Sequence, residues 1–162
     1  YLDLLVDLLL VRRLPPFHSN TGKRLVKSPK VYVRDSGVLH TLLGLDNREA
    51  VLGHPVAGGS WEGFVIEQLL SVAPERTQAC FYRSAAGAEI DLVLDLPGPE
   101  RWAIEVKRGL AAKPGKGFHQ ARADLQPKRS FLVYAGDEQY GIGDGIERIN
   151  PSQLCTLLQA SR

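Results

Sequence analysis

The spacing of apolar positions along the chain predicts a mixed α/β protein with one central sheet. The clearest strands are residues 89–95 and 102–107, two apolar runs separated by a turn at Pro97 and Gly98. Where apolar residues recur every three or four positions, a helix is expected instead. On these two patterns we expect further strands at 78–83, 130–135 and, at an edge, 146–149, and helices at 61–73, 118–125 and 151–158. From residue 60 to residue 135 the predicted order is therefore helix, three strands, helix, strand.

The first third of the chain has a different pattern. Residues 1–11 form a predicted helix that is apolar on most sides, so we expect it to be buried on more than one side, or against a neighbour that is missing from this chain. Two short strands follow, at 11–14 and 30–34. After them come a short helix capped by Asp35 or Ser36, a helical turn at 47–52, a loop at 54–59, and Ser60 as the cap of the long helix. We therefore expect an N-terminal extension, residues 1–55, and a core, residues 56–162.

The segment that contains the two short strands is strongly basic. It has seven Lys and Arg residues between Arg12 and Arg34 and no acidic residue. A helix followed by a basic hairpin has the outline of a winged-helix wing, which could lie on a phosphate backbone. A solvated loop, or a basic surface that faces an acidic partner, would have the same composition. The candidate nucleic-acid contacts are Arg12, Arg13, Lys23, Arg24, Lys27 and Lys30, together with Arg83 from a later strand.

Composition restricts the class of protein but not its function. With 162 residues, 44% hydrophobic and 23% charged, the chain is long and apolar enough for a globular domain with a real core. A net charge of +2 does not by itself indicate a nucleic-acid-binding protein. Cys80 and Cys155 lack CxxC spacing, which favours a reduced, cytoplasmic protein and leaves a disulfide between them open. There is no apolar run of membrane-spanning length, and the start at Tyr1 within a helical pattern leads us to expect a fragment of a longer protein.

Charged residues within the two clearest strands are the first indication of chemistry. Asp91 lies in the middle of one strand, and Glu105 and Lys107 share a face of the next, because side chains alternate along a strand. Such groups are costly in apolar strands unless they are paired or bind a metal ion. On the helix over 61–73, Glu62 falls within the apolar arc and is predicted to point toward the sheet, whereas Glu67 is predicted to face solvent. Glu62 could equally be a first-turn acid that is favoured by the helix dipole.

At Asp91 and at Glu105-x-Lys107, within that helix and strand order, the sequence resembles the PD-(D/E)xK nuclease superfamily, which has a restriction-endonuclease-like α-β-β-β-α-β core. The resemblance implies that Asp91 and Glu105 hold Mg²⁺ or Mn²⁺, that Glu62 completes the metal site, and that Lys107 positions or activates the attacking water. Ile90 stands where the motif has proline. Further accessory groups suggested by their positions are Glu89, Arg83 and Gln120.

A second resemblance covers most of the chain. The segments YLDLLVDLLLVRRLPPF, KRLVKSPKVYVRDSGVLH, GGSWEGFVIEQLL, FYRSAAGAEIDLVL and WAIEVKR are similar to a C-terminal domain of unknown function that follows AAA-type ATPase domains in bacterial and archaeal proteins. This resemblance implies an ATPase domain in the same polypeptide as a partner, and a homo-oligomer formed through that domain. These 162 residues contain no GxxxxGK[ST] phosphate loop.

Two functions are consistent with these observations. The first is a metal-dependent DNA phosphodiester hydrolase, which requires Glu62, Asp91, Glu105 and Lys107 to converge around an open cleft. The second is a non-catalytic module that binds nucleic acid or a protein and regulates the ATPase. The second function allows the acids to be spread apart, or to be plugged by a side chain from the basic hairpin.

Overall fold

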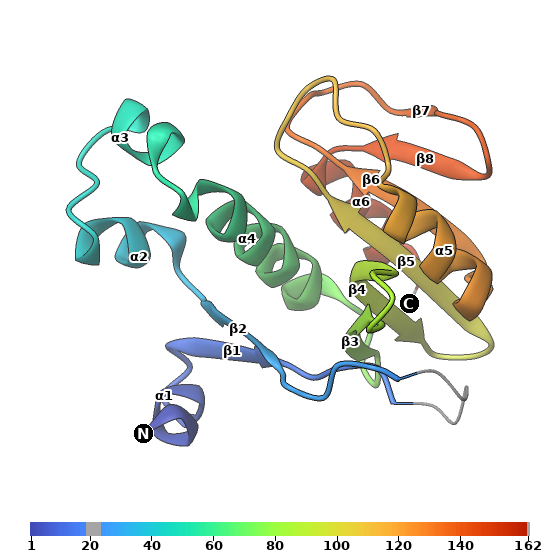
Figure 1. Ribbon diagram of the computed structural model, residues 1–162, viewed down its shortest axis with the longest axis horizontal. Helices are drawn as coiled ribbons and strands as arrows, with labels where there is room; N and C mark the ends of the chain where they lie inside the picture. The colour runs from blue at the N-terminus through green and yellow to red at the C-terminus, as the bar shows by residue number, and fades with distance from the viewer. Residues whose placement is uncertain (19–23, 162) are drawn as a thin grey trace.

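The computed structural model describes residues 1–18 and 24–161, which form an α/β fold around a mixed six-stranded sheet (Figure 1). The order across the sheet is β3-β4-β5-β6-β8-β7. Neighbouring strands are antiparallel except for β5, β6 and β8, which run parallel to one another. The strands are β3 (Gln78–Arg83), β4 (Glu89–Leu96), β5 (Glu100–Val106), β6 (Arg129–Val133), β7 (Tyr140–Gly141) and β8 (Ile146–Ile149).

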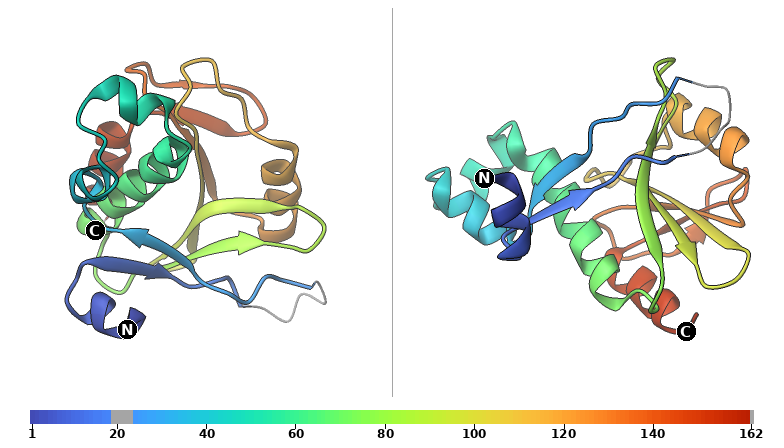
Figure 2. Two further views of the ribbon diagram at one scale, coloured as in Figure 1. Left: turned by 60° about the vertical axis from the view of Figure 1, so that its left-hand side comes forward. Right: turned by 90° about the horizontal axis from the view of Figure 1, so that it is seen from below.

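Helices cover both faces of this sheet (Figure 2). The helices α4 (Val56–Val72) and α6 (Pro151–Gln159) lie on one face, and α5 (Lys116–Leu125) lies on the other. Each face has its own apolar core. The α4-side core includes Val65, Ile66, Leu69, Leu92, Ile104, Val106 and Leu154. The α5-side core includes Tyr82, Ile90, Val93, Ala103, Phe118 and Leu132. The sequence α4-β3-β4-β5-α5-β6 is the predicted element order.

The N-terminal part of the chain packs along α4. It consists of α1 (Leu2–Asp7), β1 (Val11–Leu14), β2 (Lys30–Val33), α2 (Ser36–Leu42) and α3 (Arg48–Gly53). The strands β1 and β2 form an antiparallel pair, and the chain after β1 continues to a bridge between Pro16 and Phe81 of β3. Asp35 and Asn47 cap α2 and α3 through their side chains, since each accepts a hydrogen bond from a first-turn N–H. The hairpin is thus held between α4 and the edge of the main sheet.

The start of α4 corrects the predicted loop at 54–59 and the predicted Ser60 cap. The helix begins at Val56, directly after Pro55, whose fixed φ suits the first position of a helix. Ser60 therefore lies inside the helix, where it is buried and its hydroxyl is 2.8 Å from Nε2 of His40 in α2. The two glycines before it, which suggested a loop, are accommodated within a helix that tertiary packing stabilises.

Three smaller expectations also differ from the structure. Of the two alternatives for the first helix, burial on more than one side within this chain is wrong, because α1 lies against β1 and has no buried residue. The strand at 146–149 is not an edge strand, because β7 pairs with it on its outer side. Cys80 and Cys155 are both free and half-buried, so the disulfide alternative is not realised. Within the described residues, no helix has the length and apolar character needed to cross a bilayer.

Candidate carboxylate and lysine site

One partly buried lysine joins the N-terminal hairpin to the sheet. The Lys30 side chain, at the start of β2, is only 16% exposed. Its Nζ lies 2.8 Å from Oε1 of Glu62, 3.3 Å from Oε1 of Glu89 and 3.4 Å from Oδ1 of Asp91. The same ammonium lies 5.4 Å from the centre of the Phe81 ring. The Lys30 ammonium therefore pairs with three carboxylates, which come from two elements, α4 and β4.

A β-bulge places Asp91 in this cluster. In the β3–β4 ladder Cys80 is opposite Val93, yet Tyr82 is opposite Ile90, so β4 carries one additional residue between these pairs. A bulge changes the direction in which side chains point. Ile90 contributes to the α5-side core and Leu92 to the α4-side core, and the carboxylate of Asp91 between them reaches Lys30.

The surroundings of the cluster disfavour the charged form of Asp91 and favour the charged forms of Glu89 and Lys30. Burial, together with the neighbouring charge of Glu62, raises the pKa of Asp91 to about 6, although Lys30 opposes the shift. The Val106 N–H also donates to Oδ2 of Asp91 at 2.9 Å. Burial alone would raise the pKa of Glu89, but the hydrogen bond from Arg83 and the charge of Lys30 hold it below its usual value. The acids together give Lys30 a pKa above its usual value, although burial alone would lower it.

Tyr32 fixes the orientation of Glu62. Its hydroxyl donates to Oε1 of Glu62 at 2.5 Å, and it comes from the same strand as Lys30. Burial and the carboxylate of Glu62 raise the pKa of Tyr32, so the phenol stays protonated and remains a donor. The helix meets this ring closely at Gly63, where an added Cβ would lie 3.0 Å from Cδ1 of Tyr32. Glu62 therefore points toward the cluster, as the helical periodicity predicts.

Glu105 and Lys107 form a second, adjacent group. Their side chains are paired at 3.0 Å, on one face as the strand alternation predicts. Oε2 of Glu105 also accepts the Gly115 N–H at 3.1 Å, and the residue is buried. Ile104 and Val106 contribute to the α4-side core, so the Glu105 side chain points toward α5. The hydrogen bond from the Val106 N–H brings Asp91 against the same segment of β5.

The four predicted catalytic residues thus lie on neighbouring elements in two groups. Glu62 and Asp91 converge on Lys30, and Glu105 pairs with Lys107. Hard divalent cations prefer carboxylate oxygens, so the donor chemistry around Lys30 suits Mg²⁺ or Mn²⁺. In the described parts of the chain, however, no three His, Cys, Asp or Glu side chains are placed to hold a metal ion as they stand. An ammonium and a divalent cation repel each other strongly at this range, so a metal would require Lys30 to withdraw.

The prediction that Glu67 faces solvent is wrong. Its side chain is only 13% exposed, because the hairpin covers that side of α4. Arg12 donates to both carboxylate oxygens, at 2.5 and 3.0 Å, and Nε of Arg34 donates at 2.7 Å. Burial alone would raise the pKa of Glu67, but the hydrogen bonds from the two arginines lower it. Glu67 is therefore the anchor that holds β1 and β2 on the helix.

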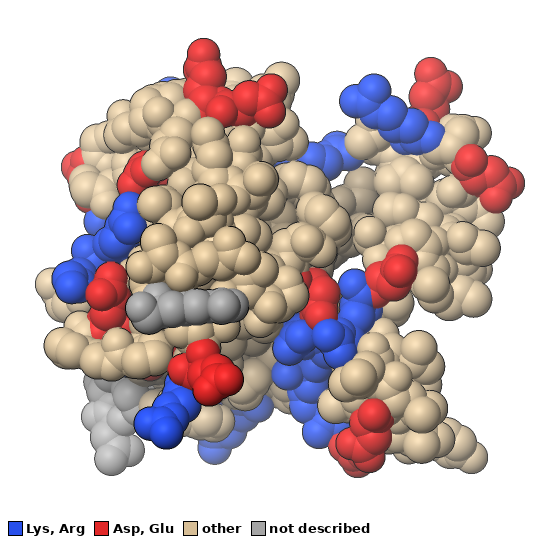
Figure 3. Space-filling model, turned by 180° about the vertical axis from the view of Figure 1, so that it is seen from behind, with Lys and Arg blue, Asp and Glu red and all other residues tan. Residues whose placement is uncertain are grey.

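Many of the predicted nucleic-acid contacts are engaged within the protein. Arg12 binds Glu67, Arg13 binds Asp3, and Arg83 binds Glu89. Lys30 is occupied by the carboxylate cluster. Arg24 and Lys27 are exposed, and Lys23 lies outside the described residues. Figure 3 shows basic side chains gathered beside acidic ones where the lobe that contains α1 meets the body of the molecule. This pairing reduces the positive charge that the hairpin presents, and the predicted contacts stay predictions.

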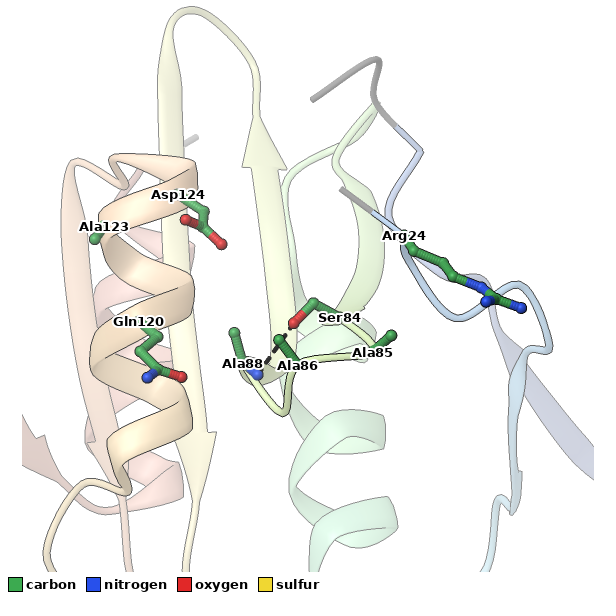
Figure 4. Close-up of a pocket in the computed structure, with 8 residues that line it drawn as sticks. All are labelled: Arg24, Ser84, Ala85, Ala86, Ala88, Gln120, Ala123 and Asp124. Carbon is green, nitrogen blue, oxygen red and sulfur yellow. Dashed lines mark hydrogen bonds between the residues drawn. The ribbon is translucent and has the colours of Figure 1, made fainter. Parts of the chain in front are cut away.

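A cavity of about 560 Å³ lies between α5 and the 84–88 turn, near Arg24 (Figure 4). Several alanines line it, and Gln120 of α5 points toward the turn. Oγ of Ser84 accepts the Ala88 N–H at 3.2 Å, and Asp124 accepts the Tyr82 hydroxyl at 2.7 Å. Arg24 extends away from α5. The polar groups here serve the fold, and they give Gln120 no evident chemical role.

Sequence reasoning missed two members of the site. The sequence pattern places neither Tyr32 nor Lys30 by name in the site, although the alternative in which a side chain of the basic hairpin plugs the acids describes the position of Lys30. Glu89 was identified through its shared strand face with Asp91, and its pairing with Lys30 agrees with that placement. The signal that could have identified Lys30 is that the inward acids outnumber the cations on their own elements, which favours a further cation from elsewhere in the chain.

Comparison with known proteins places the chain in a family. A family model described as a domain of unknown function, DUF4143, matches residues 57–154, which is more than half of the chain. The chain belongs to the DUF4143 family. A second model, also a domain of unknown function (DUF8612), matches residues 1–49, which precede the DUF4143 domain. The predicted division of the chain after residue 55 stays a prediction.

Two curated relatives are similar to nearly the whole chain. They are uncharacterized proteins of Mycobacterium bovis and Mycobacterium tuberculosis, each 40% identical over 157 residues. The match covers 96% of this chain and 35% of each relative, so this DUF4143 chain spans about a third of their length. No solved structure matches the chain.

Proposed function

We propose that this DUF4143 domain is a divalent-metal-dependent DNA phosphodiester hydrolase in which Lys30 occupies the cation position of the resting state. The observation that carries the proposal is the convergence of Glu62, Glu89 and Asp91 on one cation. Asp91 also contacts the backbone of the Glu105-x-Lys107 segment. The acids of α4 and β4 therefore lie near the segment of β5 that contains Glu105 and Lys107, which supports a site of the PD-(D/E)xK kind.

The chain's own residues have separate parts in this proposal. Asp91, Glu105 and Glu62 would hold Mg²⁺ or Mn²⁺, which supplies an activated water and neutralises charge on the phosphate. Lys107 keeps its proton, because its ion pair with Glu105 raises its pKa although burial alone would lower it. It can then donate to a phosphate oxygen. The Val106 and Gly115 N–H groups fix the orientation of Asp91 and Glu105, and Tyr32 fixes that of Glu62.

The decisive experiment is DNA cleavage in the presence of Mn²⁺ by the wild type, Lys30→Met and Asp91→Asn. The proposal predicts more cleavage by Lys30→Met than by the wild type, because the competing ammonium is gone. It predicts none by Asp91→Asn or by the double variant. Lys128→Met is the matched control, since Lys128 is exposed and pairs with Glu100 at the start of β5, at 3.3 Å. If a folded Lys30→Met protein neither binds Mn²⁺ nor cleaves DNA, the hydrolase proposal fails.

A second candidate is favoured by the position of Lys30 itself. An ammonium that already balances the carboxylates makes the cluster self-sufficient, as in a nuclease-like scaffold used only for binding. In this case the domain is a cytoplasmic regulatory module that docks on nucleic acid or on a protein, such as an AAA-type ATPase domain of the same polypeptide that itself forms a homo-oligomer. The exposed leucines of α1, including Leu4 and Leu5, would suit a protein surface. Under this candidate, Lys30→Met loses stability without gaining Mn²⁺ binding or cleavage.

A further inference from the structure

A second charged site lies at the other end of the sheet, around Arg148 of β8. Arg148 is only 8% exposed, although it carries a full positive charge. Its Nη1 donates to the Tyr140 hydroxyl at 2.7 Å, and its Nη2 donates to the carbonyl of Ala112. Both partners are neutral. Burying a charge without a counter-ion is costly, so this arrangement requires an explanation.

The usual source of a counter-ion is absent within the described residues. No carboxylate of residues 1–18 or 24–161 pairs with Arg148, and its Nε has no hydrogen-bond partner there. The neighbouring acid, Glu147, pairs instead with Arg129 at 3.1 Å. The rings of Tyr134 and Tyr140 lie 4.7 and 5.6 Å from the guanidinium carbon. Such rings stabilise the cation but leave its charge in place.

Arg148 lines a cavity of about 590 Å³ together with a lysine and a histidine. Lys113 comes from the β5–α5 loop and His119 from the first turns of α5, and both line the same cavity. The helix α5 begins directly after Gly115 of this loop, and the Gly115 N–H donates to the buried carboxylate of Glu105. Asp144, the acid in the lining, has a side chain that is 78% exposed, and its Oδ2 lies 4.0 Å from Nδ1 of His119.

We propose that this cavity binds a phosphate group, with the buried guanidinium of Arg148 as its charge partner and Lys113, His119 and the Tyr140 hydroxyl as additional donors. A dianionic phosphate fits because several donors line the cavity beside a buried charge that no carboxylate of the described residues neutralises. The phosphate could be free in solution or could be the terminal phosphate of a nucleic acid. The inference is independent of the proposed hydrolase activity, since it uses none of the carboxylate cluster.

The test is calorimetric titration in EDTA, which prevents any metal-dependent cleavage. The probes are inorganic phosphate and a short single-stranded oligonucleotide with either a 5′-phosphate or a 5′-hydroxyl end. We expect phosphate, the 5′-phosphorylated oligonucleotide, or both to bind. We expect the 5′-hydroxyl oligonucleotide to bind at least tenfold more weakly than its phosphorylated form, if that form binds. Binding of inorganic phosphate alone identifies the free ion as the ligand, and binding of the phosphorylated end alone identifies a nucleic-acid terminus.

Variants separate a binding role of Arg148 from a structural one. Arg148→Gln should abolish phosphate binding, and Lys113→Ala should weaken it by roughly tenfold, the effect of one charged hydrogen bond. Arg129→Gln is the matched control, because Arg129 also stacks on aromatic rings but has an acidic partner, and it should leave binding unchanged. If Arg148→Gln does not fold, Lys113→Ala and His119→Ala decide the matter. The proposal is overturned if no phosphate probe binds the wild type, or if these exposed variants bind as well as the wild type.

Discussion

Replacing Lys30 by methionine should destabilise the domain in a way that depends strongly on pH. Methionine keeps the apolar stem of the side chain near Phe81 but removes the ammonium that contacts Glu62, Glu89 and Asp91. Removing one partner of a buried ion pair typically costs about 3–5 kcal/mol. Because Lys30 and Glu62 retain side-chain exposures of 16% and 22%, we expect the lower end, about 3 kcal/mol at pH 8.

The sign of the pH dependence follows from protonation of the acids. Without the ammonium, the pKa of Asp91, already raised to about 6 by burial and the charge of Glu62, must rise further. A folded-state pKa above the unfolded value makes stability fall as the pH rises toward that folded value. Each additional pKa unit is worth about 1.4 kcal/mol. The difference in stability between wild type and Lys30→Met should therefore shrink to about 1 kcal/mol at pH 5, where the acids take up protons.

The assay is urea unfolding at pH 5 and pH 8, monitored by tryptophan fluorescence, since the ring of Trp102 is buried in the α4-side core. The control Lys128→Met removes a lysine that is 63% exposed, and it should cost no more than about 1 kcal/mol at either pH. A loss for Lys30→Met that is equal at the two pH values, or no larger than that of the control, would refute the reasoning.

Three further predictions concern the surroundings of the cluster. Gly63→Ala places a Cβ 3.0 Å from the Tyr32 ring and should lower the unfolding free energy by about 1–3 kcal/mol. Gly58→Ala in the same helix meets open space and should raise the unfolding free energy by up to about 1 kcal/mol. Thermal unfolding of the two variants measures both effects. Glu67→Gln leaves Arg12 and Arg34 without their anion, so it should cost about 2 kcal/mol of unfolding free energy at pH 7 and speed proteolysis of the hairpin. Because the pKa of Glu67 is lowered in the folded state, this cost should shrink as the pH drops through the acidic range. A cost that does not change with pH would contradict the role of Glu67 in holding β1 and β2 on α4. Asp91→Asn keeps an acceptor for the Val106 N–H but cannot ionise. Relative to this variant, the wild type should lose up to about 3 kcal/mol of unfolding free energy as the pH rises from 4 to 7.5, which is the equivalent of a pKa raised from 3.8 to about 6. Parallel curves of stability against pH would contradict the raised pKa of Asp91.

The main sheet could be predicted from the sequence because its elements carry strong local signals. The apolar runs that form β4 and β5 and the Asn150 and Pro151 start of α6 are determined within a few residues of chain. The start of α4 could not be predicted, because Gly58 and Gly59 disfavour a helix locally. Packing of α2 and the His40–Ser60 hydrogen bond support the helix from outside.

The charged site was predicted only in part, for a related reason. Strand alternation and helical periodicity identify which side of its own element a residue faces. They correctly place Glu105 and Lys107 on one face of β5, and Glu62 on the side of α4 that faces the sheet. They carry no information about a distant segment that covers an exposed face. The hairpin brings Lys30 to Asp91 across 61 residues of chain, and Arg12 to Glu67 across 55. Both the neutralising role of Lys30 and the burial of Glu67 depend on that long-range packing.

Titration of Mn²⁺ into Lys30→Met, with heat of binding measured by calorimetry, tests most directly whether the carboxylates around Lys30 form a cation site. We predict one site in Lys30→Met, weaker binding in the wild type because its ammonium competes, and no binding when Asp91→Asn is added to Lys30→Met. A folded Lys30→Met protein that gives no heat with Mn²⁺ would contradict this account, and the cluster would then be a structural salt bridge within a binding module.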